Sequence, residues 1–225
     1  MRFKLEESKL KTILFLSWRD IKAPKMGGAE IYTHEMLKRM DKTNYRILHF
    51  SPLFEGCSEE ENIDGIKYYR SGSVLSVIPK AFKFYKQNRN KIDYVVNQCN
   101  THRFFTKIWV EKSKRIFFIH QLTKKIWFYH MKFPMSLIGY LLETPLLKLN
   151  RKDLTITVSD STKKDLIDIG FIPEKISTLS EGLSFTPWKQ EDFKKKETEP
   201  TIIYVGRFAE YKGIDASLVA FSMIK

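Results

Sequence analysis

The chain has 225 residues and a formal net charge of +13, from 39 basic and 26 acidic residues. Its content of 43% hydrophobic and 29% charged residues is typical of a soluble globular protein and allows a core of useful size. The N-terminus lacks an apolar signal region, and no run of about 18 apolar residues occurs, so we predict no transmembrane helix. The basic excess predicts an anionic partner, such as a phosphorylated metabolite, nucleic acid or a membrane face; a solvated lysine-rich surface is the alternative.

The two cysteines indicate in which cellular compartment the protein occurs. Cys57 and Cys99 are far apart and form no CxxC motif. Neither a disulfide framework nor a metal site follows from them, and we expect a cytoplasmic protein.

Short apolar runs alternate with helical patterns along most of the chain. Runs typical of strands cover 12–17, 45–50, 66–70, 92–98, 115–120, 154–159 and 176–180. Helical spacing predicts helices over 28–40, 75–88, 101–110, 135–149 and 160–170. We expect Pro145 to kink or break the fourth helix and Gly170 to cap the fifth. Apolar strands separated by helices predict an α/β domain over 1–184, with a Rossmann-like, doubly wound parallel sheet covered on both faces.

The pattern starts again near the end of the chain. Residues 185–200 are charged, carry proline near both ends and are predicted to form a linker. Residues 201–205 are typical of a buried strand, and a helix follows that reaches Lys225 without a glycine or proline stop. We expect 201–225 to be the first βα unit of a second domain.

Ligands of an open parallel sheet bind beyond the carboxyl ends of its strands, so residues that follow strands are candidates for a site. Gly27 and Gly28 precede a helix, where free N–H groups favour an anion, although no GxGxxG motif is present. The alternative is a glycine pair that only permits a turn. His120 ends the strand over 115–120 and would bond a sugar hydroxyl or a phosphate; a structural histidine is the alternative.

Two cations flank the turn after residues 201–205. Arg207 would grip phosphate oxygens in a bidentate manner and Lys212 would add a point charge, which suits a diphosphate. The alternative is a pair of exposed loop cations. The sequence shows no cluster of His and Asp typical of a metal site, so we expect no metal.

Four stretches, in this order, resemble the retaining glycosyltransferases of family 4, which have the GT-B fold. They are GGAEIYTHEM, FFIHQL, ITVSDSTKKDLIDIGFIPEKISTLSEGLSF and IIYVGRFAEYKGID. Many members have Asn-Gly where this chain has Glu181-Gly182. The resemblance implies that a nucleotide-sugar binds between two Rossmann-like domains and that the first domain holds most of the acceptor.

The resemblance also implies roles for the candidate residues. Arg207 and Lys212 would neutralise the departing diphosphate, which acts mainly in the transition state. Gly27 and Gly28 would lie beside the phosphates or the transferred sugar, and His120 would contact that sugar. No cofactor is implied beyond the nucleotide-sugar substrate.

The family's second domain continues well beyond the last matching motif and holds two glutamates that grip the donor. We therefore expect this chain to be an incomplete fragment with little or no transferase activity of its own. The alternative is a non-catalytic sugar- or lipid-binding module completed by a partner chain; a reading frame that continues into the paired glutamates would favour the enzyme. No helix-turn-helix, zinc finger or RNA-binding motif occurs, so we do not expect nucleic acid to bind.

The stretch over 112–133 is rich in basic and aromatic residues, and its composition bears on the kind of acceptor. It contains Trp127, Phe128, Tyr129 and Phe133 between lysines, a composition that suits docking on an anionic membrane. Family members often use lipid-linked or polysaccharide acceptors, so a peripheral position on the inner membrane face is expected. The alternative is that these aromatic residues pack in the core or line the acceptor cleft.

Overall fold

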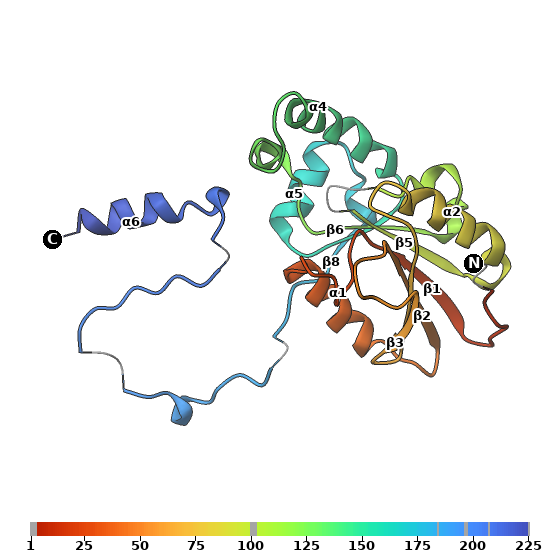
Figure 1. The fold of residues 1–225 in the computed structure, drawn as a ribbon, viewed down its shortest axis with the longest axis horizontal. Coiled ribbons are helices and arrows are strands. Elements are labelled where there is room, and N and C mark those ends of the chain that lie inside the picture. The colour runs from red at the N-terminus through yellow and green to blue at the C-terminus, as the bar shows by residue number, and fades with distance from the viewer. Residues whose placement is uncertain (1–3, 100–102, 184, 196–197, 207, 225) are drawn as a thin grey trace. The chain divides into compact units, whose positions relative to one another are not determined.

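The computed structural model describes residues 4–99, 103–183, 185–195, 198–206 and 208–224 (Figure 1). It divides into two compact units. The first comprises Met1–Leu122 and Thr144–Gly182, and the second comprises Thr123–Glu143 and Leu183–Lys225.

The first unit is built on an eight-stranded sheet with the order β3-β4-β2-β1-β5-β6-β7-β8. The strands are β1 (Lys11–Leu16), β2 (Tyr45–Ser51), β3 (Glu60–Ile63), β4 (Ile66–Arg70), β5 (Tyr94–Cys99), β6 (Arg115–Ile119), β7 (Leu154–Thr157) and β8 (Ile176–Thr178). Neighbouring strands are parallel, except that β3 pairs antiparallel with β4. The chain builds outward from β1 in one direction and from β5 in the other, so a topological switch point lies between these two strands.

The helices are α1 (Gly28–Arg39), α2 (Val77–Asn88), α3 (Trp127–His130), α4 (Met135–Leu147), α5 (Asp160–Asp168) and α6 (Ile214–Ser222). Helices α1, α2 and α5 belong to the first unit, and α3 and α6 to the second. Every helix in the described ranges is too short or too polar to cross a bilayer.

Both faces of the sheet are buried, as the apolar strands predict. On one face Leu14 packs with Phe84 of α2. On the other face Phe15, the next residue of the same strand, packs with Leu37 of α1. Because successive side chains of a strand point to opposite faces, this alternation needs a helix layer on each side of the sheet. The predicted doubly wound α/β fold is confirmed.

The end of α5 follows the predicted glycine cap. Gly170 has a φ of 95°, which favours glycine, and its N–H donates to the carbonyl of Ile167 at 2.8 Å. The expected break at Pro145 is wrong, because α4 continues to Leu147. Pro145 lies in the last turn of that helix, where the missing N–H costs a single helical hydrogen bond.

Two elements differ from the sequence-based prediction. Of the predicted helix over 101–110, the described residues form only a 3-10 turn at Thr106–Ile108, which follows Phe105 at a φ of 51°. Strand β3 was not predicted, because its sequence EENI is polar and only half buried. A short polar edge strand carries no apolar alternation by which the sequence would identify it.

The predicted strand over 201–205 is wrong in this structure. These residues form no strand, and Ile202, Ile203 and Val205 are at least 72% exposed. A strand needs a neighbour for its backbone groups, and none of the described strands pairs with this segment. The helix that follows is present as α6, after a 3-10 turn at Glu210–Lys212. A further 3-10 turn lies at Gln190–Asp192 in the predicted linker.

Candidate active site

The loop between β1 and α1 carries the glycine pair. Gly27 is extended and donates its N–H to Oε2 of Glu30 at 2.6 Å. The next two amides, those of Gly28 and Ala29, lie at the start of the helix. A Cβ added to Gly28 would meet no atom within 4 Å, so the turn is open on that side. The first amides of a helix have no acceptor within the helix, so they are available to a ligand. Glu30 is buried and is balanced by Arg19, whose Nε lies 3.3 Å from Oε1.

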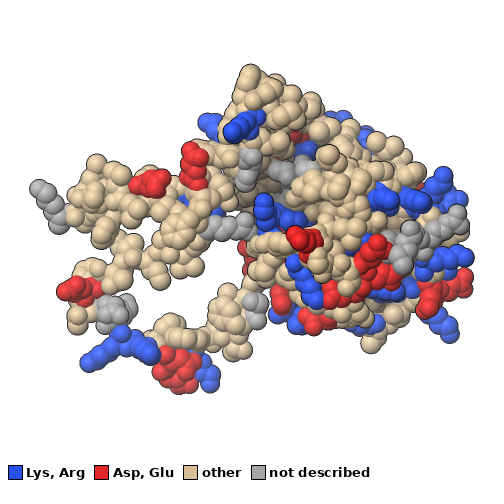
Figure 2. All heavy atoms as spheres, viewed as in Figure 1, with Lys and Arg blue, Asp and Glu red and all other residues tan. Residues whose placement is uncertain are grey.

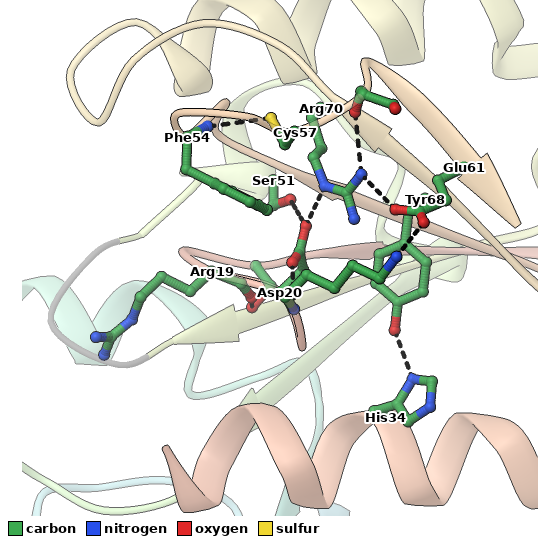
Figure 3. A network of polar contacts seen from close by, with 12 residues as sticks. Arg19, Asp20, His34, Ser51, Phe54, Cys57, Glu61, Tyr68 and Arg70 are labelled. Atoms are coloured by element: carbon green, nitrogen blue, oxygen red, sulfur yellow. Dashed lines mark hydrogen bonds and ion pairs between the residues drawn. The ribbon is translucent and has the colours of Figure 1, made fainter. Parts of the chain in front are cut away.

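A buried ion pair holds the same loop (Figure 3). Asp20, four residues after β1, pairs with Nε of Arg70, the last residue of β4. Its Oδ2 also accepts from the hydroxyl of Ser51 at 3.1 Å, and its Oδ1 accepts from the amide of Lys22 at 2.8 Å. The ion pair thus ties the β1–α1 loop to the ends of β2 and β4.

Arg70 extends this network toward the sheet edge. Its Nη1 donates to the carbonyl of Ser58 and to Oε2 of Glu61, both at 3.0 Å. Lys22 in turn pairs with Oε1 of Glu61, so β3 also supports the loop (Figure 3). No sequence motif predicts this network. Asp20 and Arg70 lie at or just beyond strand ends, and that position was the available signal.

His120 follows β6 directly and is connected to the first turn of α1. Its Nε2 lies 3.1 Å from Nε2 of Gln98, and the same amide nitrogen donates to Oγ1 of Thr33 at 2.7 Å. Thr33 donates to the carbonyl of Ala29 at 2.8 Å. Because an amide nitrogen only donates, Nε2 of His120 accepts, and its proton belongs on Nδ1.

The surroundings of His120 keep the ring neutral. Burial lowers its pKa to about 4. Phe118 lies 4.7 Å away between ring centroids, and Tyr32 makes an edge contact at 5.4 Å. At neutral pH His120 therefore offers a polar contact without a charge.

Tyr32 fixes α1 against the segment after β8. Its hydroxyl donates to the carbonyl of Leu179 at 2.8 Å. Burial, and then the negative charge of Glu181, raise the pKa of the phenol, so Tyr32 stays protonated at physiological pH.

A pocket of about 420 Å³ opens at the carboxyl ends of β6, β7 and β8, and we call it the His120 pocket. It is lined by His120, Gln121, Leu122, Val158, Ser159, Ser161, Thr162, Asp165 and Glu181. The hydroxyl of Thr162 donates to the carbonyl of His120 at 3.0 Å, and that of Ser159 donates to Thr162 at 3.0 Å. The start of α5 is thereby fixed against the end of β6.

The structure brings some of the predicted residues together. Gly27, Gly28 and His120 belong to one unit and are connected through Thr33 and Gln98. Lys212 lies in the second unit, with its Nζ 5.3 Å from the centroid of the Tyr211 ring. Arg207 lies outside the described residues. Within the described ranges no three His, Cys, Asp or Glu side chains gather to hold a metal ion.

Comparison with known proteins shows which fold and family the chain resembles. A sucrose-phosphate synthase from Thermosynechococcus elongatus has a similar structure, with a TM-score of 0.66 and 16% sequence identity. The match covers 95% of this chain and 60% of that enzyme, so the chain has the α/β fold of a GT-B glycosyltransferase over part of its length. No curated protein sequence matches the chain. The model of glycosyltransferase family 4 matches residues 26–185, and the chain belongs to that family.

Proposed function

We propose that this chain is the acceptor-side part of a retaining glycosyltransferase, which transfers a sugar from a nucleotide-sugar to a polysaccharide or glycolipid. The observation that carries the proposal is the hydrogen-bonded connection from the first turn of α1 through Gln98 to His120. It connects the first turn of α1, whose amides suit an anion, to a neutral imidazole at the carboxyl edge of the sheet.

In this proposal the two parts of the site have different tasks. The amides of Gly28 and Ala29 bind donor phosphate oxygens, since a helix N-terminus favours an anion. Arg207 and Lys212 neutralise the diphosphate as the glycosidic bond breaks, which lowers the barrier because the negative charge is largest in the transition state. Those cations take the place of a metal ion, so the proposed reaction uses the nucleotide-sugar and no cofactor.

His120 orients the transferred sugar. A histidine with a pKa of about 4 remains neutral at pH 7 and is a poor proton donor for a leaving group. Its Nδ1–H suits a sugar hydroxyl oxygen. We therefore assign His120 a contact with the sugar rather than a proton transfer.

The family resemblance also leads us to propose how the chain is organised. Residues 1–184 form the acceptor-binding domain, 185–200 a linker and 201–225 the start of the donor-binding domain. The chain spans 60% of the length of the GT-B enzyme it matches, and we expect little or no turnover from these 225 residues alone.

Donor screening tests the function. A form of the protein with a complete donor domain is incubated with labelled nucleotide-sugars and membrane glycolipids, and the anomeric configuration of the product is determined. We expect transfer with retention, lost in Arg207→Ala and reduced at least tenfold in His120→Ala. Transfer with inversion, or full turnover by the 225-residue chain, would contradict the proposal.

An exposed apolar surface in the second unit supports docking on a membrane. Trp127 is buried, but Phe128, Tyr129 and Phe133 are 50%, 56% and 78% exposed. Of the alternative that these four aromatic residues pack in the core or line the acceptor cleft, the first part applies to Trp127 alone. Further exposed apolar residues on α4 are Met135, Leu137, Ile138, Leu141 and Leu142.

Cations accompany this surface. Lys124, Lys125 and Lys132 belong to the same segment, and Figure 2 shows mostly uncharged atoms where Figure 1 places α4. Apolar and aromatic side chains beside lysines favour the interface of an anionic bilayer. We propose that the protein acts in the cytoplasm, peripheral to the inner membrane face, where a lipid-linked acceptor would be found.

A further inference from the structure

A buried carboxylate lies where a phosphate site needs positive potential. Glu30 is in the first turn of α1, and its side chain is 4% exposed. Its Oε2 accepts the N–H of Gly27 at 2.6 Å, so the carboxylate belongs to the same turn as the amides of Gly28 and Ala29. A negative charge at this place stabilises the helix dipole but repels a phosphate. A phosphate site here therefore needs a cation that cancels the charge.

Arg19 supplies that cation. Its Nε lies 3.3 Å from Oε1 of Glu30, and within the described ranges no other cation pairs with this carboxylate. The guanidinium is also held from a second side, because its Nη1 donates to the carbonyl of Lys25 at 2.5 Å. Through Arg19 and Gly27, the carboxylate of Glu30 thus connects the start, the middle and the end of the β1–α1 loop.

The backbone at Arg19 is fixed by contacts of its own. The hydroxyl of Ser17 donates to the carbonyl of Arg19 at 2.9 Å, and the next residue, Asp20, is held by the buried ion pair with Arg70. Figure 3 shows the guanidinium of Arg19 turned away from that ion pair. The side chain of Arg19 is therefore placed to serve Glu30 and not Asp20.

The carboxylate of Glu30 has two properties that can be separated. As an acceptor it holds the N–H of Gly27, a bond that the amide oxygen of a glutamine also makes in a capping box. As a charge it requires Arg19, because a buried carboxylate without a cation is costly. Helix capping alone needs the first property and leaves the ion pair without a task.

We infer that Glu30 and Arg19 are a pair of positioning residues for the donor phosphates. Glu30 holds the turn at Gly27 and Gly28 so that the helix amides face the ligand, and Arg19 cancels the charge that would otherwise repel it. The inference rests on the proposed function, in which the amides of Gly28 and Ala29 bind donor phosphate oxygens. Neither side chain has to touch the ligand, which distinguishes Arg19 from a cation that grips the diphosphate itself.

Inorganic pyrophosphate, titrated at constant ionic strength into the isotopically labelled 225-residue chain, is the probe, and the amide shifts of Gly28 and Ala29 are followed. Arg19→Gln leaves the charge of Glu30 uncancelled, so we expect the pyrophosphate affinity to fall at least about fivefold. Arg19→Gln/Glu30→Gln removes both charges and should return the affinity to within about twofold of the wild type. If Arg19 gripped pyrophosphate directly, this double variant would stay as weak as Arg19→Gln.

A second double variant of equal charge tests the hold on the turn. Arg19→Gln/Glu30→Ala lacks the acceptor for the N–H of Gly27 that Arg19→Gln/Glu30→Gln retains. We expect its Gly27 amide to exchange with deuterium at least about tenfold faster, and its pyrophosphate affinity to be at least about threefold lower. Glu35→Gln, farther along the same helix and paired with Arg39, controls for a lost carboxylate and should leave the affinity within about twofold.

The outcomes separate this inference from the proposed function. Equal affinity in the wild type and Arg19→Gln, no recovery in Arg19→Gln/Glu30→Gln, or equal affinity in the two double variants would overturn the inference and leave the phosphate site in place. No pyrophosphate shift at Gly28 and Ala29 in the wild type would remove the phosphate site and the inference with it. The amides of β1 should keep their shifts in every variant, which shows that the fold is retained.

Discussion

Asp20 and Arg70 form an ion pair with both side chains fully removed from solvent, although 50 residues separate them in the chain. The pair joins the end of β4 to the loop that carries the glycine turn, which consists of Gly27 and Gly28. An ion pair at this depth is maintained only when its other polar atoms are bonded, and here Ser51, Lys22, Ser58 and Glu61 supply most of those bonds.

Breaking one side of this pair should be costly. Arg70→Met leaves Asp20 buried without its cation, and we expect a loss of about 3–5 kcal/mol in the free energy of unfolding, measured with urea. The double variant Asp20→Leu/Arg70→Met should recover much of that loss, because no buried charge remains. A loss below about 1 kcal/mol in the single variant would show that the pair is not buried in solution.

A substitution at Gly28 should weaken ligand binding without lowering the stability of the protein. Gly28→Ala places a Cβ in open space and improves helix propensity, so the free energy of unfolding should stay the same or rise by up to about 1 kcal/mol. Nucleotide-sugar affinity, measured by calorimetry, should fall at least threefold, because the methyl group obstructs approach to the helix amides. Unchanged affinity would remove the glycine turn from the donor site.

The neutral state of His120 predicts a direction for pH dependence. Its pKa in the folded state is about 4, below the ordinary 6.5, so the unfolded chain binds a proton more readily. The stability contribution is therefore complete above pH 6.5 and is lost as the pH falls toward about 4. His49 shares this behaviour, with burial lowering its pKa to about 4.

Stability of the wild type and of His120→Gln, measured by urea unfolding across this pH range, checks that direction. The variant should lose less stability on acidification than the wild type, by a difference on the order of 3 kcal/mol at the acid end. Identical pH profiles would mean that His120 titrates normally.

Gly139 of α4 is closed to any side chain. A Cβ there would overlap the indole ring of Trp127, and a rigid ring offers little adjustment. Gly139→Ala should therefore displace Trp127, despite a propensity gain of about 1 kcal/mol, and shift its fluorescence to longer wavelength. Trp127→Phe/Gly139→Ala, with a smaller ring, should restore the helix contact. A Gly139→Ala emission spectrum identical to that of the wild type would refute the contact.

The proposed membrane docking predicts a difference between binding to anionic and to neutral vesicles. The chain should sediment with vesicles that contain anionic phospholipid more than with neutral vesicles, and less at high salt. Phe128→Ser/Phe133→Ser should reduce binding severalfold, whereas Phe185→Ser, which is 64% exposed elsewhere in the second unit, should not. Equal sedimentation with both vesicle types would exclude the proposal.

The sequence predicts most of the sheet because its parallel strands are buried on both faces and read as apolar runs, as in Leu14 and Phe15. It did not predict β3, because the polar residues of that strand are typical of a loop. It also did not predict that residues 201–205 form no strand, because strand formation depends on a neighbouring strand that no local pattern encodes. Pairing is a long-range property, so local periodicity cannot supply it.

The same limit applies to the site. The position of His120 after a strand identified it as a candidate, but its charge state follows from burial, to which Tyr32 of α1, a residue distant in the sequence, contributes an edge contact. Gln98 carries no motif at all, and its role appears only once β5 lies beside β6.

A nucleotide-sugar titration of the isotopically labelled chain decides whether the glycine turn and His120 form one site. We expect one nucleotide-sugar to shift the amides of Gly28 and Ala29 and the ring signals of His120 together, with a single dissociation constant. Shifts at the glycine turn that leave His120 unchanged, or no shift at either place with any nucleotide-sugar, would contradict it.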